Sequence, residues 1–170
     1  MQGMEIAEKY YEQYSLPMVR EVCPELEERV AFGLVGEGSQ CFGYDDEISR
    51  DHDFGPGFCI WLLEDDFANY GGRLQAAYEM LPKEFMGLST DNIQEKSRVG
   101  VMRIDEFFFK YLGLSEPPRT NREWLFLKET ILSICTNGKV FRDDNDRGKC
   151  ANLPITDHPH DVFQMVLQES

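Results

Sequence analysis

Two apolar runs of strand length flank the most acidic stretch of this 170-residue chain. The first run is AFGLVG (31–36), the second is FCIWLL (58–63), and five of the nine residues from Asp45 to Asp53 are acidic. Short apolar runs bounded by turn residues are typical of buried strands. Carboxylates at this density repel one another unless a positive charge offsets them. The pattern predicts two core strands joined by a segment that is either a solvated loop or a cation site.

Helical periodicity surrounds these two strands. The apolar spacing predicts a helix over 3–15 that Pro17 ends, a short helix from Pro24, a helix over 64–81, a strand over 98–104 and a helix over 105–113. Residues 83–97 are polar and predict a loop. The alternation of helices with three strands predicts an α+β fold built on a small mixed sheet.

The sequence changes character after Glu116-Pro117-Pro118. Two adjacent prolines stiffen the chain and end a helix, so they predict a boundary between an α/β domain (1–116) and a helical segment (119–170). Within the second part, the pattern predicts a helix over 121–138 capped by Thr120 or Asn121, an acidic loop over 140–149, and a further amphipathic helix from residue 158. That last helix suggests the start of a longer helical domain.

Charge and cysteine usage exclude several classes of partner. The chain holds 17 Lys and Arg against 31 Asp and Glu, a formal charge of −14. Nucleic acids and anionic membranes would be repelled by such a surface, whereas a nucleotide accompanied by a divalent ion would not. The five cysteines form no CxxC pair, and no apolar run reaches the length of a membrane span. We therefore expect reduced thiols and a cytoplasmic location.

Two short motifs bracket the acidic stretch. Gly38-Ser39 follows the first strand, where a glycine allows close backbone approach and free N–H groups can hold a phosphate. Asp51-His52-Asp53 comes twelve residues later, and in an extended segment the two aspartates face one way. Paired carboxylates are suitable ligands for Mg²⁺ that also binds substrate phosphates. As alternatives, the aspartates belong to a solvated loop and Gly38-Ser39 is an ordinary turn or helix cap.

Gly-Ser, a spacer and Asp-x-Asp together resemble the active-site pattern of the nucleotidyltransferase fold shared by polymerase-β-like enzymes. The longer string GEGSQCFGYDDEISRDHDFGPGF resembles more closely a bacterial family known as DUF4037, as do REWLFLKETILSICTNGKVFRDD and HPHDVF further along. The resemblance implies a minimal nucleotidyltransferase-type mixed sheet with packed helices and a C-terminal helical extension. It also implies that Gly38 and Ser39 bind the phosphates of a nucleoside triphosphate, ATP above all, and that Asp51 and Asp53 are the catalytic Mg²⁺ ligands.

The third carboxylate of the broader fold has no counterpart at the expected place. The aligned position on the next strand is Gly100, and Asp105 or Glu106 follows several residues later. Three functions therefore stay open. The first is a Mg²⁺-dependent nucleotidyltransferase that moves a nucleoside monophosphate onto a hydroxyl of a small molecule or a protein. The others are a non-catalytic nucleotide- or metal-binding regulatory module and a protein-interaction domain.

Overall fold

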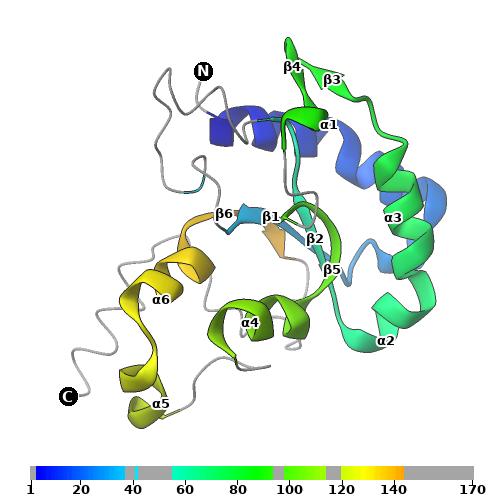
Figure 1. Ribbon diagram of the computed structural model, residues 1–170. Helices are drawn as coiled ribbons and strands as arrows, with labels where there is room; N and C mark the ends of the chain where they lie inside the picture. The colour runs from blue at the N-terminus through cyan, green and yellow to red at the C-terminus, as the bar shows by residue number, and fades with distance from the viewer. Residues whose placement is uncertain (1–2, 37–40, 42–54, 94–97, 114–119, 144–170) are drawn as a thin grey trace.

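The computed structural model describes residues 3–36, 41, 55–93, 98–113 and 120–143. Within these ranges the fold is α+β, as predicted, with a four-stranded mixed sheet covered by helices on both faces (Figure 1). The strands are β1 (Ala31–Val35), β2 (Cys59–Leu62), β5 (Gly100–Arg103) and β6 (Gly138–Asp143), in the spatial order β5-β2-β1-β6. β2 and β5 are parallel, and the other neighbouring pairs are antiparallel.

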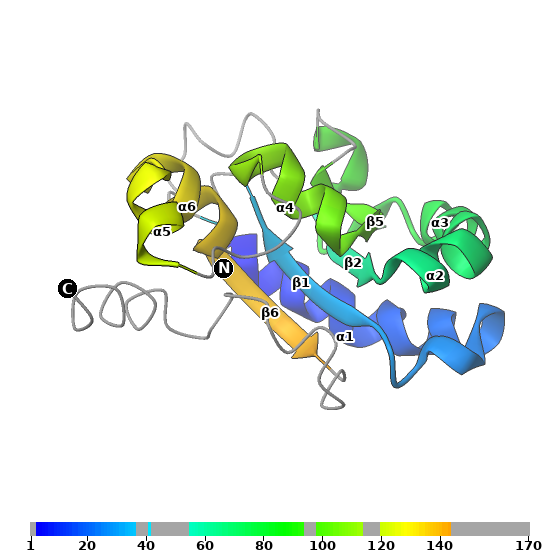
Figure 2. The same cartoon turned by 90° about the horizontal axis from the view of Figure 1, so that it is seen from below.

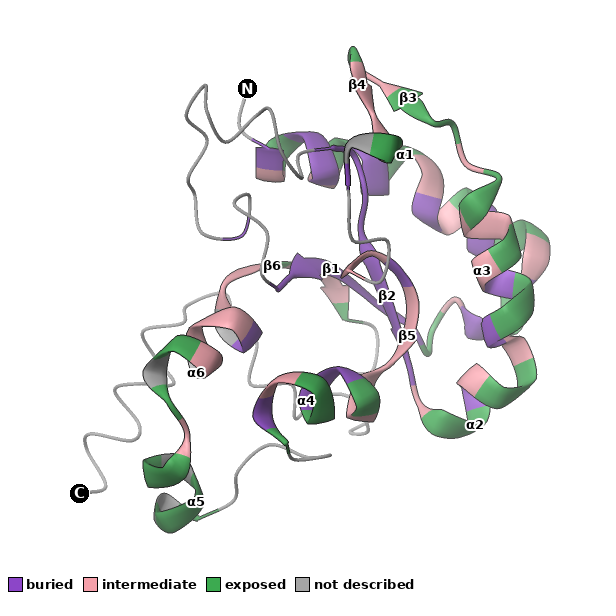
Figure 3. Cartoon of the chain, in the orientation of Figure 1, coloured by how far each residue is buried: buried purple, intermediate pink, exposed green. Residues whose placement is uncertain are grey.

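The two predicted apolar runs form the centre of this sheet. Every residue of β1 and β2 is buried, and Phe32 lies opposite Ile60 in their register. Phe32 and Ile60 pack with α1 (Gly3–Val22), whereas Trp61 packs with α4 (Ile104–Leu112) on the other face. Figure 2 shows α1 and α4 on opposite sides of the strands, and Figure 3 shows β1 and β2 as buried along their whole length. Continuous apolar strands are the consequence of this two-sided cover.

Helix α1 continues past Pro17, so the predicted end at that residue is wrong. Proline removes one backbone donor and disfavours a helix interior. Met18 and Val19, which follow it, are 6% and 0% exposed in the core, and the helix continues to Val22. Burial of that last turn offsets the cost of the proline. The short helix predicted from Pro24 is a single 3₁₀ turn, Pro24–Leu26.

The predicted helix over 64–81 has three parts. They are α2 (Glu64–Asp66), a π-helical turn (Phe67–Gly71) and α3 (Gly72–Glu79). A β-carbon at Gly71 would lie 2.9 Å from the ring of Phe67, so the glycine makes room for that ring inside the turn. Beyond α3, the segment predicted as loop contains a hairpin, β3 (Glu84–Phe85) and β4 (Leu88–Ser89), and a 3₁₀ turn (Thr90–Asn92).

The helical part after residue 119 differs from the single helix predicted there. It consists of α5 (Asn121–Phe126) and α6 (Glu129–Thr136), because Lys128 has extended backbone and interrupts the helix. Thr120 is the predicted cap: its hydroxyl accepts the N–H of Glu123 at 3.3 Å, and Glu123 accepts the N–H of Thr120 at 3.1 Å. This reciprocal pair is a capping box.

Strand β6 is the main element that the sequence analysis missed. Residues 140–143 were predicted to begin an acidic loop, yet Gly138–Asp143 pairs along the whole of β1, with Val35 opposite Gly138 and Ala31 opposite Asp143. The chain after the predicted boundary therefore contributes a strand to the same sheet. The boundary residues 116–118 lie outside the described residues, as does the helix predicted from residue 158.

Candidate functional site

The four residues predicted to bind nucleotide and metal lie outside the described residues. These are Gly38, Ser39, Asp51 and Asp53. The ends of the segment that carries them are described, since β1 leads into Gly36 and the chain resumes at Gly55. Cys41 is also described: it is 8% exposed, and its thiol lies 3.8 Å from the carbonyl oxygen of Leu34. The surroundings of these anchor points define the candidate site.

The segment leaves and re-enters the sheet at a single edge. β1 ends there, while β2, β5 and β6 all begin there, because Cys59 pairs with both Gly33 and Gly100, and Val35 pairs with Gly138. Three glycines with positive φ mark this edge: Gly36 at 132°, Gly100 at 97° and Gly138 at 108°. We call this end of the sheet the glycine edge. Backbone of this kind is available to glycine and strained for other residues.

The chain enters β2 through a tightly packed Gly55-Pro56-Gly57, all three of which are buried. A β-carbon at Gly55 would lie 2.6 Å from the carbonyl oxygen of Ser89, and one at Gly57 would lie 3.0 Å from the side chain of Ile93. A side chain at Gly55 would collide with backbone atoms, and one at Gly57 would require Ile93 to shift. The packing fixes where the chain carrying Asp51 and Asp53 joins the sheet.

The hydroxyl of Tyr78 completes this junction. It accepts a hydrogen bond from the backbone N–H of Phe58 at 3.1 Å, one residue before β2. Burial raises the pKa of Tyr78 well above the ordinary value for a phenol, so the hydroxyl keeps its proton at every physiological pH.

The position aligned with the third carboxylate cannot hold one in this conformation. Gly100 has a φ of 97°, and a β-carbon there would lie 2.8 Å from the side-chain oxygen of Gln75. Gln75 is held in place because that oxygen accepts the N–H of Val101 at 2.9 Å and its amide nitrogen donates to Glu79 at 3.0 Å. Both backbone strain and lack of space exclude an acidic side chain at this position.

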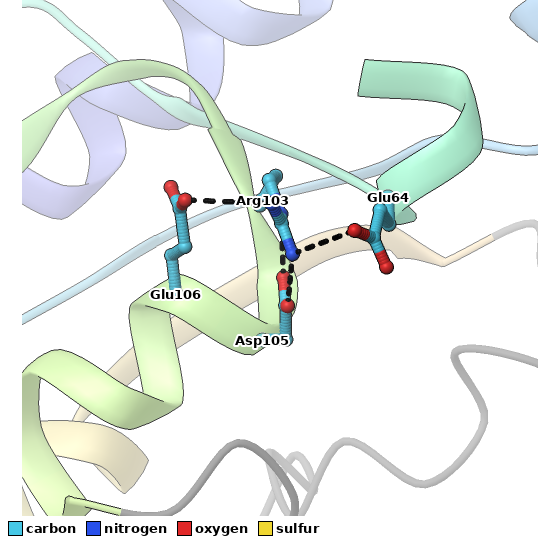
Figure 4. Close-up of polar contacts among 4 residues, drawn as sticks. All are labelled: Glu64, Arg103, Asp105 and Glu106. Carbon is cyan, nitrogen blue, oxygen red and sulfur yellow. Dashed lines mark hydrogen bonds and ion pairs between the residues drawn. The ribbon is translucent and has the colours of Figure 1, made fainter. Parts of the chain in front are cut away.

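Asp105 and Glu106 do not replace the missing acid, because they follow the opposite end of β5. Gly100 and Arg103 are three residue steps apart along the strand, about 10 Å. Arg103 binds Asp105 at 2.5 Å, Glu64 at 3.5 Å and Glu106 at 3.6 Å (Figure 4). The hydrogen bond from Arg103 holds the pKa of Asp105 below its usual range. These carboxylates neutralise an arginine and join α2, β5 and α4.

A cavity of about 470 Å³ lies beside the junction at Pro56. Its lining residues belong to α1, to α3, to the 3₁₀ turn after the hairpin and to the chain just before β5. They include Tyr10, Pro56, Tyr78, Thr90, Ile93 and Val99. Lys83, Glu79 and Asp91 also line it, and all three are exposed. Within the described ranges, the hydroxyl oxygen of Thr90 is buried and has no hydrogen-bond partner. This cavity could not be predicted from the sequence, because its residues come from a segment with the pattern of a polar loop and from helices with the pattern of core elements.

The described residues hold no group of three His, Cys, Asp or Glu side chains that could bind a metal ion. The thiol of Cys59 is buried beside the glycine edge and lies 3.1 Å from the carbonyl oxygen of Arg98. Burial raises its pKa to about 12, so it is neutral and a poor metal ligand. In the described ranges, no helix combines the length and apolar character needed to cross a membrane.

Comparisons with family models, with curated proteins and with solved structures find no match for this chain.

Proposed function

We propose that this chain is a Mg²⁺-dependent nucleotidyltransferase that moves a nucleoside monophosphate from a triphosphate onto a hydroxyl group. One observation carries the proposal. The segment with Gly-Ser and Asp-x-Asp joins two adjacent antiparallel strands, β1 and β2, at the edge where the parallel strand β5 also begins. Buried strands anchor both ends of that segment at one edge of the sheet, which supports a site at this edge.

The residue types in that loop suit a magnesium triphosphate. Asp51 and Asp53 supply hard oxygen donors, which Mg²⁺ prefers, and Gly38 and Ser39 supply N–H and hydroxyl donors for phosphate oxygens. Bound there, the metal would neutralise charge on the phosphates during transfer. The positive φ of Gly36 supports the role of the nearby Gly38 and Ser39, since glycine at the end of β1 lets the backbone change direction at once.

A non-catalytic, nucleotide-binding regulatory role is the second candidate. Gly100 favours it, because its φ of 97° and the contact with Gln75 exclude the carboxylate that would serve as general base. The two candidates share the binding step and differ in the transfer step. A general base contributes a factor of about 10² to 10⁴ to the rate of the chemical step. Its loss would therefore slow transfer and leave nucleotide binding intact.

The test compares two double variants with the same change of charge. Asp51→Asn with Asp53→Asn removes the proposed metal ligands, and Asp45→Asn with Asp46→Asn is the control within the same acidic stretch. Calorimetry with ATP should show binding that requires Mg²⁺, lost in the first variant and kept in the second. Transfer of label from α-labelled ATP to an acceptor distinguishes the enzyme from the binding module. Equal, metal-independent behaviour of both variants would refute both candidates and favour the interaction domain.

A further inference from the structure

We draw no further inference here: the strongest candidate, the apolar surface patch that Leu125 and Phe126 form on the short helix α5, is 82% and 76% exposed at these two residues, but nothing in the structure shows what covers it.

Discussion

The side-chain oxygen of Gln75 lies 2.8 Å from the point that a β-carbon at Gly100 would occupy. The same oxygen accepts the N–H of Val101, so a hydrogen bond joins α3 to the start of β5. This close approach requires a glycine at position 100. This explains in physical terms why the strand next to the proposed site begins without a carboxylate.

Replacement of Gly100 should therefore destabilise the fold. Gly100→Ala forces a φ of 97° on a residue with a side chain and displaces Gln75, so we expect a loss of about 1–3 kcal/mol in the free energy of unfolding. Gly72→Ala is the matched control, because Gly72 has helical φ and nothing within 4 Å of the added carbon. It should gain about 0.5–1 kcal/mol. Urea unfolding of both variants measures the difference; equal stabilities would contradict the role given to Gln75.

The contact between Arg103 and Asp105 predicts a pH dependence of stability. The pKa of Asp105 is lower in the folded chain than in the unfolded chain, chiefly through the hydrogen bond from Arg103. Its contribution is therefore complete above the unfolded pKa of about 3.9 and is lost as the pH falls through the folded value.

Asp105→Asn should accordingly lower the free energy of unfolding by about 0.5–1 kcal/mol at pH 7. The difference from the native chain should shrink as the pH falls below about 4. Glu106→Gln is the control, since Glu106 is 64% exposed and lies 3.6 Å from the arginine. It should change stability less. A deficit of Asp105→Asn that stays constant down to pH 2 would show that the carboxylate charge is not responsible.

The turn of the β3–β4 hairpin holds a residue in an unfavourable conformation. Met86 has a φ of 52° and Gly87 a φ of 81°, and together they form the two-residue loop between Phe85 and Leu88. Asparagine adopts such a φ at lower cost than methionine. Met86→Asn should raise the free energy of unfolding by about 0.5–1 kcal/mol. Met86→Ala, which removes the exposed side chain without relieving the backbone, should not; thermal unfolding of the two variants tests this.

The ion pair of Arg29 with Asp66 should contribute more than any exposed pair. Asp66 is 8% exposed at its side chain and lies 3.0 Å from Arg29, which is half exposed. Arg29→Met leaves a buried carboxylate without its partner, and we expect a loss of about 1–3 kcal/mol. Arg20→Met, which breaks the exposed pair with Glu27, should cost less. Chemical denaturation gives both values, and a larger loss for Arg20→Met would reverse the ranking.

Local patterns in the sequence predict the parts of the fold that depend on neighbouring residues. The apolar runs at 31–36 and 58–63 are β1 and β2, and the Thr120 cap and the end of α4 at Gly113 lie where predicted. Strand β6 could not be predicted this way, because GKVFRD has only two adjacent apolar side chains, Val140 and Phe141, and no alternating pattern. These residues form a strand because β1 offers its free edge, which no local pattern reveals.

The candidate site likewise has a part that the sequence predicts and a part that depends on the fold. Gly38, Ser39, Asp51 and Asp53 were chosen for their chemistry, and that assignment stays a prediction since they lie outside the described residues. The cavity depends on the approach of α1, α3 and the hairpin, so Tyr78 and Thr90 gave no signal in the sequence. The sequence shows that Gly100 stands where the third carboxylate is expected. Only the fold shows the contact with Gln75 that leaves no room for an acidic side chain there.

Strand β6 pairs with β1 across more than a hundred residues of intervening chain. During synthesis the ribosome would release the whole of β1, β2 and β5 before Gly138 emerges. Until then β1 would present an unpaired, fully apolar margin to any other nascent chain, a common origin of aggregation. The yield of folded protein should thus depend on translation speed and on chaperones that bind the exposed edge of β1 until β6 is synthesised.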